Sequence, residues 1–354
     1  MSDATTDEPT LVRELLSGDQ RALARVISKI EDRAPGYRDL VAACHRHAGD
    51  ATVLGITGSP GSGKSTLVDK LAATYRDQGE TVGIIAVDPS SPFTGGAVLG
   101  DRIRMGSNVG DMDVFVRSMS ARGTLGGLST ATADAVTALD AFGKDRIIIE
   151  TVGAGQNEVD IVRTADTVAV LVPPGSGDDV QMLKAGILEI GDVFVVNKAD
   201  LSGADRMVSE LREMLQERRG ETAARGHHGH EAPPDGDEDS DGGSDASAWR
   251  PEVVETVASD GDGIPELVET FAAHHEYLVD SGALEAQRRE RYAEMVQDLV
   301  RADLRDLAAR RIQRMGGLES AVDRIVDRET DPYAVAEDII GPIADCVEGA
   351  EDKG

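Results

Sequence analysis

The chain has 354 residues, of which 40% are hydrophobic and 3% aromatic, so it is long enough for one large domain or two ordinary ones around an aliphatic core. Its formal net charge of −29 argues against a nucleic-acid partner, because nucleic acid requires a basic face. No apolar run approaches the roughly 18 residues that span a bilayer. The acidic start MSDATTDEPT is unlike a secretory signal, and the two cysteines suit a reducing compartment, so we expect a cytoplasmic protein with no membrane partner.

The negative charge is spread along the chain. Residues 220–248 carry eight acidic residues and one arginine, a net charge of −7, which leaves −22 for the remainder. Arginine outnumbers lysine by 29 to 7. A diffuse acidic surface with few lysines is typical of a protein that stays soluble in concentrated salt, where self-repulsion is screened, and we therefore predict a halophilic protein.

The first 275 residues show two patterns. Residues 7–32 place leucine and isoleucine at helical spacing, which predicts an N-terminal helical unit over residues 1–50. Beyond it, apolar runs that predict strands alternate with helical segments, and these runs cover residues 51–58, 81–88, 113–118, 146–151, 167–173 and 192–198. Because such near-continuous runs are typical of parallel strands covered on both faces, we predict an α/β domain with a mostly parallel, doubly wound sheet over residues 51–275.

The later part of the chain departs from this alternation. Residues 220–248 are rich in acid, glycine and serine, which predicts a disordered insertion in the domain, and the sheet resumes near residue 251. From residue 283, apolar residues recur at helical spacing until Gly316-Gly317, and a shorter helical segment follows near 319–340. These patterns predict a C-terminal helical arm over residues 276–354.

The segment GSPGSGKS at 58–65 matches the P-loop pattern, with an apolar strand before it and a helical sequence after it. Its glycines let backbone N–H groups turn toward phosphate oxygens, and the start of the helix adds its positive dipole end. We expect Lys64 to reach the β- and γ-phosphates and the Ser65 hydroxyl to bind Mg²⁺. The predicted phosphate site comprises Gly58, Ser59, Pro60, Gly61, Ser62, Gly63, Lys64, Ser65 and Thr66.

The segment RIIIETVG at 146–153 ends an apolar strand on a carboxylate and follows it with a glycine. P-loop enzymes place a carboxylate at the end of a second strand to hold Mg²⁺, directly or through water, which predicts that role for Glu150. Gly153 would turn a backbone N–H toward the γ-phosphate and move when that phosphate leaves. A purely structural glutamate at a strand end is the alternative.

The segment NKAD at 197–200 follows another apolar strand and predicts the base. Asp200 can accept hydrogen bonds from the guanine N1–H and exocyclic amino group, whereas adenine lacks this pair of donors and would leave the carboxylate unmatched. We expect Asn197 to contact the guanine edge, the Lys198 stem to cover the ring face, and a backbone N–H of Ala258 or Ser259 to lie near guanine O6. The ligands are therefore GTP and GDP with Mg²⁺.

With these motifs in place, nearly the whole chain resembles the MeaB/ArgK-type P-loop GTPases that accompany adenosylcobalamin-dependent methylmalonyl-CoA mutase. The resemblance rests on the stretches GITGSPGSGKST, AVDPSSPFTGGAVLGDRIRM, RGTLGGLS, ETVGAGQNE, GDDVQMLKAG and VNKADL. It implies a methylmalonyl-CoA mutase partner, whose cofactor loading or protection the GTPase gates. It also implies that the C-terminal helices pair two subunits into a homodimer.

The resemblance implies further site residues. Asp88 and Asp101 would lie near Mg²⁺, and residues 150–156 would form the second switch. Gln181 and Lys184 would belong to a mobile segment that communicates with the mutase and adjusts hydrolysis. From the residues alone, Asp88 at a strand end fits either a Mg²⁺ or water ligand or a cap for the turn before Pro89. Gln181 and Lys184 fit equally a solvated helix face.

One familiar element of GTPases is missing. The glutamine that orients water in Ras-like enzymes would directly follow Gly153, where this chain has Ala154, and Gln156 comes two residues too late. Intrinsic hydrolysis should therefore be slow, as in a switch that waits for a partner.

Several alternatives stay open at the level of sequence. A metal-insertion GTPase of the nickel type is suggested by His227, His228 and His230, although they lie in the acidic insertion without a nearby cysteine. A small-molecule kinase would use the same P-loop but would not need NKAD, and a scaffold would not need Lys64, Ser65 and Glu150 intact. The C-terminal amphipathic stretch also fits a membrane-surface helix, but its mixture of acids and arginines on the polar face favours a dimer interface.

Overall fold

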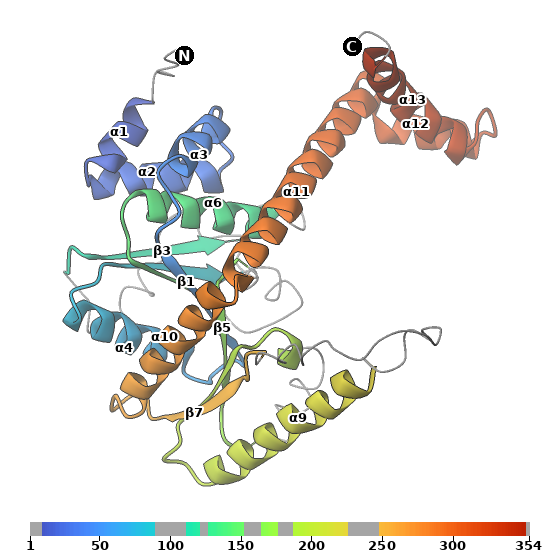
Figure 1. Ribbon diagram of the computed structural model, residues 1–354. Coiled ribbons are helices and arrows are strands. Elements are labelled where there is room, and N and C mark those ends of the chain that lie inside the picture. The colour runs from blue at the N-terminus through green and yellow to red at the C-terminus, as the bar shows by residue number, and fades with distance from the viewer. Residues whose placement is uncertain are drawn as a thin grey trace, which may run out of the picture. The chain divides into compact units, whose positions relative to one another are not determined.

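The computed structural model describes residues 9–88, 111–120, 127–151, 164–175, 187–225 and 248–351. The chain divides into two compact units, residues 1–288 and 289–354. The first unit is built on a seven-stranded sheet in the order β3-β2-β4-β1-β5-β6-β7, in which every neighbouring pair is parallel (Figure 1). The strands are β1 (Thr52–Gly58), β2 (Val82–Asp88), β3 (Val114–Ser120), β4 (Arg146–Thr151), β5 (Thr167–Val172), β6 (Val193–Asn197) and β7 (Glu252–Thr256).

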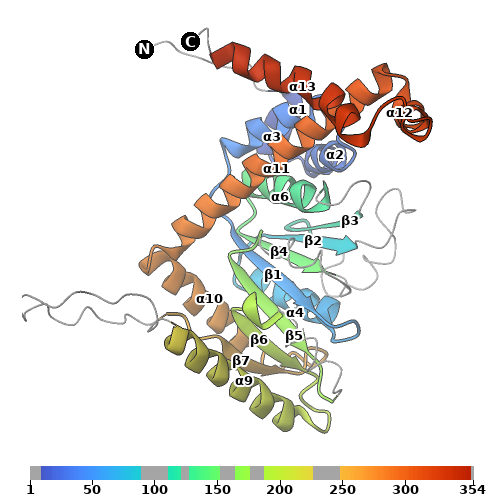
Figure 2. The same cartoon turned by 90° about the vertical axis from the view of Figure 1, so that its right-hand side faces the viewer.

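Helices cover both faces of this sheet, so the predicted doubly wound α/β fold is confirmed. The first unit contains α1 (Thr10–Leu16), α2 (Gln20–Glu31), α3 (Tyr37–His45), α4 (Lys64–Asp77), α6 (Gly127–Ala141), the short 3₁₀ helix η2 (Ile187–Glu189), α9 (Ala204–Arg225) and α10 (Ile264–Asp280). One core layer joins α1, α2, α3, α6 and α9 to the sheet. The opposite layer joins α4 and α10 to it. Figure 2 shows α2, α3 and α6 on one side of the strands and α4 on the other.

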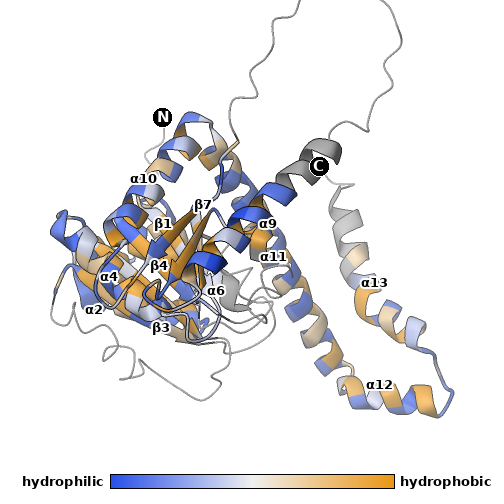
Figure 3. Cartoon of the chain, turned by 90° about the horizontal axis from the view of Figure 1, so that it is seen from below, coloured by the Kyte–Doolittle hydropathy of each residue, from blue (hydrophilic) through white to orange (hydrophobic). Residues whose placement is uncertain are grey.

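The strands read as apolar runs because both faces are covered. Every residue of β1, β5 and β6 is buried, as expected for central strands of a parallel sheet. Figure 3 shows the resulting concentration of hydrophobic residues in the strands. The edge strand β7 differs, because Glu252 and Glu255 are exposed while Val254 and Thr256 are buried.

The N-terminal helices share the core of the sheet. In α2, Leu23, Val26, Ile27 and Ile30 are buried at helical spacing, and the Asp19 carboxylate caps the helix by accepting from the Arg21 N–H at 2.8 Å. Asp140 on α6 then holds the connection to β1. Its carboxylate accepts from the backbone N–H groups of Gly49, Asp50 and Ala51 at 2.7, 3.2 and 3.1 Å.

The C-terminal part is helical, but it contains one more break than the sequence pattern predicted. Helix α11 (Ala283–Arg314) continues into the second unit, which also contains α12 (Gly317–Val326) and α13 (Pro332–Glu351). The predicted segment near 319–340 is therefore two helices. Asp331 starts the second by accepting from the Tyr333 and Ala334 N–H groups at 2.9 and 3.0 Å, and Pro332 takes its first position. Among the described residues, every helix is either too short or too polar to span a lipid bilayer.

Candidate nucleotide site

The predicted phosphate loop lies between β1 and α4, at the carboxyl end of the sheet. Gly58, Gly61 and Gly63 all have positive φ angles, of 141°, 78° and 97°. Two of these positions also lack room for a side chain. A Cβ on Gly58 would lie 2.2 Å from the Leu171 carbonyl oxygen on β5, and one on Gly63 would lie 2.3 Å from the Asn197 side-chain nitrogen. The loop conformation therefore depends on glycine for backbone freedom at all three positions and for close packing at two.

Side-chain donors hold four carbonyl groups of this loop. Lys64 Nζ donates to the Gly58 and Ser59 carbonyls at 2.7 and 3.0 Å, so it reaches back across the loop from the start of α4. Lys198 Nζ donates to the Gly61 carbonyl at 2.8 Å, and Asn197 Nδ2 donates to the Ser62 carbonyl at 2.7 Å. These contacts fix the orientation of the loop peptides, which is the condition for presenting N–H groups to an anion.

Glu150 and Ser65 meet beside the loop. The register of β4 places Glu150 opposite Ile56 on β1 and Ala86 on β2. Its carboxylate is buried and accepts from the Ser65 hydroxyl at 2.6 Å. Two hard oxygen donors from different elements thus lie together at the first turn of α4, which is a donor set suited to Mg²⁺.

The NKAD segment is tied to the P-loop and to the chain that follows β7. The side chain of Asn197, at the end of β6, is buried. Its Oδ1 accepts from the Thr256 hydroxyl and from the Ala258 N–H, both at 3.1 Å, while its Nδ2 holds Ser62. Lys198 adopts a left-handed backbone conformation, with φ 61°, and the next residues turn into exposed Asp200. One amide therefore links the three segments predicted to bind phosphate and guanine.

The remaining predicted phosphate and base residues lie around these contacts. Ser59 is buried, and Pro60 and Thr66 are exposed on either side of the loop. Ala258 is buried and Ser259 beside it is exposed. The structure thus brings GSPGSGKS, NKAD and residues 256–259 (TVAS) together at the carboxyl end of the sheet with Glu150.

Several predicted residues lie outside the described residues: Asp101, Gly153, Ala154, Gln156, Gln181, Lys184, the three histidines at 227, 228 and 230, and residues 122–126 of RGTLGGLS. For Asp88 the structure describes the backbone, which ends β2 opposite Ser120, but not the carboxylate. These assignments remain predictions.

Three threonines to which the sequence motifs assigned no role also belong to the site. Thr256 donates to Asn197, as described above. Thr151, directly after Glu150, donates its hydroxyl to that of Thr57, directly before Gly58, at 3.1 Å. The only sequence signal was their adjacency to the motif residues, because the contacts cross between strands.

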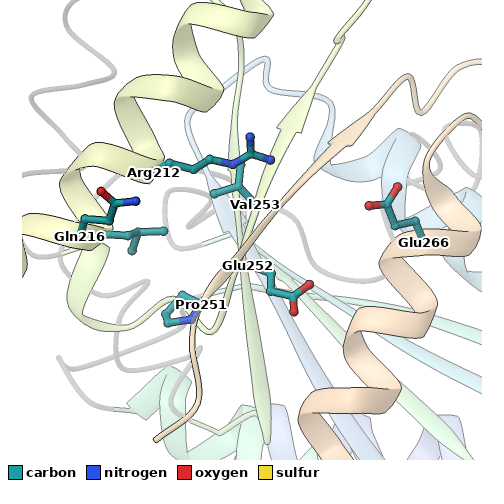
Figure 4. Close-up of a pocket in the computed structure, with 7 residues that line it drawn as sticks. Arg212, Gln216, Pro251, Glu252, Val253 and Glu266 are labelled. Carbon is teal, nitrogen blue, oxygen red and sulfur yellow. The ribbon is translucent and has the colours of Figure 1, made fainter. Parts of the chain in front are cut away.

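A pocket elsewhere on the first unit is lined by none of the predicted site residues. It has a volume of about 370 Å³ and lies at the amino end of β7, between α9 and α10. Figure 4 shows Arg212 and Gln216 on α9, Glu252 on β7 and Glu266 on α10 around it. This pocket places one cation beside two acids and lacks a glycine loop, so it does not resemble the phosphate site.

A second cluster of polar side chains occupies the amino end of the sheet. The His274 ring on α10 lies 2.8 Å from the Thr167 hydroxyl through Nδ1 and 3.7 Å from the Asp192 carboxylate through Nε2. Trp249 covers it, with ring centroids 4.6 Å apart, and donates its indole N–H to the Asp192 carbonyl at 2.8 Å. Burial lowers the pKa of His274 to about 4 and raises the pKa of Asp192 to about 6.

Comparisons with known proteins agree with the geometry of the nucleotide site. A family model described as methylmalonyl Co-A mutase-associated GTPase MeaB matches residues 23–313. A protein of Pyrococcus abyssi that is named as a GTPase is 45% identical over 333 residues, which are 94% of this chain and 96% of the relative. The mouse protein named methylmalonic aciduria type A homolog, mitochondrial, is 32% identical over 256 residues, or 71% of this chain and 55% of the relative.

A solved structure, described as a LAO/AO transport system kinase, shares the fold. It superposes with a TM-score of 0.64 at 22% identity and covers 97% of this chain and 99% of its own. At this identity the similarity concerns the architecture alone.

Proposed function

The chain belongs to the MeaB family of GTPases and hydrolyses GTP, and from this premise we propose that it is a Mg²⁺-dependent switch that gates cofactor loading or protection of an adenosylcobalamin-dependent methylmalonyl-CoA mutase. The observation that carries the proposal is the family match over residues 23–313, whose description names the mutase. The mouse relative adds support, because its printed name connects it with methylmalonic aciduria.

The residues at the P-loop fit Mg²⁺. Ser65 and Glu150 would hold the ion, since their oxygen atoms already lie 2.6 Å apart. Asp88 and Asp101 are proposed as further ligands, directly or through water. When bound, Mg²⁺ neutralises part of the charge on the β- and γ-phosphates.

In the proposed hydrolysis, water attacks the γ-phosphate in line with the departing GDP. Lys64 and the N–H groups of the loop stabilise the charge that develops on the transferred phosphoryl group. Its hydrogen bonds to the Gly58 and Ser59 carbonyls hold the Lys64 ammonium group against the loop. Gly153 is proposed to contact the γ-phosphate through its N–H. Because Ala154 stands where a water-orienting glutamine would follow, the intrinsic rate should be low, with Gln181 and Lys184 adjusting it when the partner binds.

Guanine selectivity is proposed to reside in Asp200. The two hydrogen bonds that Asn197 Oδ1 accepts hold the NKAD turn against the Ala258 segment. The nearby backbone of Ala258 and Ser259 would then face guanine O6 while Asp200 accepts from the opposite edge of the ring.

We also propose a homodimer formed by the C-terminal helices. On α11, the side chains of Tyr292, Val296, Val300, Leu304 and Leu307 recur every three or four residues and are 40–59% exposed. On α12, Leu318, Val322 and Val326 form a second exposed stripe. Apolar stripes of this length are typical of helices that pack against a partner. Replacing Val296 and Val300 by glutamate should convert the dimer to a monomer in light scattering, and an unchanged mass would contradict this assignment.

The surface charge supports a further proposal, that the protein works in the cytoplasm of a cell rich in salt. The chain then needs screening to limit self-repulsion, and its unfolding temperature should rise with salt concentration. Full stability in dilute buffer would contradict this proposal.

The decisive experiment measures phosphate release from GTP and from ATP in high salt, with and without the methylmalonyl-CoA mutase of the same cell. Slow GTP-selective turnover that rises with the mutase would support both halves of the proposal. GTP-selective turnover indifferent to the mutase would keep the GTPase and exclude this partner. A phosphorylated metabolite in place of inorganic phosphate would indicate a kinase.

A further inference from the structure

The ends of β1 and β4 are joined by a hydrogen bond between two buried threonines. Thr151 Oγ1 donates to Thr57 Oγ1 at 3.1 Å, and the two residues are only 0% and 2% exposed. Thr57 directly precedes Gly58, where the P-loop begins. Thr151 directly follows Glu150 and is the last described residue of the predicted second switch, residues 150–156.

The strand register puts this pair on the side of the sheet opposite Glu150. Ile56 pairs with Glu150, so Thr57 and Thr151 are the next residues along the two parallel strands. Because side chains alternate between faces, the threonines point toward the layer that contains Ile147 and Ile149. Glu150 points toward the layer of α4, where it accepts from Ser65.

Two consecutive residues of β4 are therefore attached to P-loop segments on opposite faces of the sheet. Glu150 is joined to the start of α4, and Thr151 is joined to the end of β1. A strand end held at both faces has little freedom to rotate about its own axis. Such a rotation is the motion that would move the Glu150 carboxylate away from Ser65.

We propose that Thr57 and Thr151 are positioning residues for GTP hydrolysis, whose hydrogen bond fixes the direction of Glu150 and hence the affinity of the site for Mg²⁺. The proposal rests on the GTPase activity and is independent of the mutase partner. Because the two buried hydroxyls bond each other within the sheet, the proposed action of both threonines is through Glu150 and not on the nucleotide itself.

The test compares the full-length protein with Thr151→Val, Thr57→Val, the double variant and Thr151→Ser. Valine keeps the shape of threonine but removes the hydroxyl. We expect Thr151→Val to raise the Mg²⁺ concentration for half-maximal turnover by about fivefold and to lower kcat by a similar factor. Mg²⁺ should slow the release of a fluorescent GDP analogue from both proteins, but by a smaller factor from Thr151→Val than from the parent. This readout needs no hydrolysis.

Two comparisons separate positioning from simple loss of stability. The double variant should be no worse than the more affected of the two single valine variants, because both remove the bond that the threonines share, and Thr151→Ser should recover Mg²⁺ dependence within about twofold. Thr270→Val is the matched control, since it removes a buried hydroxyl bonded at 2.9 Å to the Glu266 carbonyl within α10. It should lower the unfolding temperature without changing Mg²⁺ dependence. An unchanged Mg²⁺ dependence in Thr151→Val, or additive effects of the two valines, would overturn the proposal.

Discussion

The two ends of the sheet both bury polar side chains, yet only one end is built to exchange its contacts for a ligand. At the carboxyl end, Lys64 and Lys198 donate to carbonyls of a glycine loop, and Ser65 and Glu150 bond each other. At the amino end, the His274 ring packs against the Trp249 ring and lies 3.7 Å from the Asp192 carboxylate.

The difference lies in the backbone around each cluster. Gly58, Gly61 and Gly63 have positive φ angles and form an open loop whose peptide groups can face a phosphate. The amino-end cluster joins strand starts to one helix, and Thr167 and His274 are almost fully buried. Burial and shifted pKa values alone therefore do not identify a site. The turn chemistry at the carboxyl ends of parallel strands does so here, as expected for open α/β sheets.

The largest expected effect comes from removing the Lys64 ammonium group at the carboxyl end of the sheet. Lys64→Ala should reduce GTP turnover by about a thousandfold, because the ammonium group stabilises charge in the transition state. Phosphate release measures the loss, and thermal unfolding should show a folded protein. The control is Lys70→Ala, on the same helix but beyond the loop, which should retain turnover within about twofold. Comparable activity in the two variants would contradict the phosphate site.

A substitution at the carboxyl end of the sheet should also change which base the nucleotide site prefers. Asp200→Asn should weaken GTP binding by about a hundredfold or more, because the amide cannot accept both guanine donors. The new amide N–H should instead favour xanthosine triphosphate, whose ring carries an oxygen in place of the amino group. Competition between the two nucleotides measures the switch, and unaltered GTP turnover would exclude Asp200 from the base site.

Steric substitutions in the loop should differ sharply from one glycine to the next. Gly58→Ala should destabilise the protein by about 3 kcal/mol, because the new Cβ meets the Leu171 carbonyl oxygen at 2.2 Å and the φ angle is 141°. Gly61→Ala meets no atom within 4 Å and should cost only about 1 kcal/mol of backbone strain. Denaturant unfolding compares the two variants, and equal losses would show that strain, not contact with β5, controls the loop.

At the amino end, one substitution should change stability and leave catalysis unchanged. Trp249→Phe keeps a ring over His274 but loses the N–H that donates to the Asp192 carbonyl. The expected cost is about 1 kcal/mol in the free energy of unfolding. GTP turnover should stay within about twofold of the parent, and a tenfold loss would mean that this end of the sheet serves the nucleotide site.

The last comparison concerns pH. Burial raises the pKa of Asp192 from 3.8 to about 6, so the folded protein binds this proton more tightly than the unfolded chain does. This carboxyl therefore makes stability fall as pH rises from about 4 to about 6. Asp192→Asn removes that dependence while it can still accept from the Val168 N–H. The difference in unfolding temperature, variant minus parent, should be larger above this pH range than below it. A difference that does not change with pH would contradict the assignment.

Much of the nucleotide site was predictable from short stretches. GSPGSGKS and NKAD each place their predicted functional residues within one turn, so spacing alone indicated that the residues of each motif lie close together. Glu150 was predictable because it ends an apolar run. The role of Asn197 as a bridge was not, because its partners Ser62 and Ala258 lie 135 and 61 residues away.

The same limit applies to the Thr57–Thr151 pair and to the cluster at Trp249. Thr57 and Thr151 meet only because β1 and β4 are neighbours, although two strands intervene between them in the chain.

The break between α12 and α13 had a local signal, since Asp331-Pro332 is a typical helix start. The apolar residues nevertheless continue at helical spacing across this break, which predicted one helix in place of two.

The sequence by itself indicated the strands of the sheet, the positions of the glycine turn and the carboxylates, and guanine nucleotide as the ligand. These properties follow from hydrophobic periodicity and turn chemistry, which act over a few residues. Only the tertiary structure decided the strand order β3-β2-β4-β1-β5-β6-β7 and, with it, the contacts of Asn197, Thr57 and Trp249. Backbone hydrogen bonds between parallel strands are the same for any neighbour. The order therefore depends on how all the helices pack on both faces at once, which no single stretch of sequence encodes.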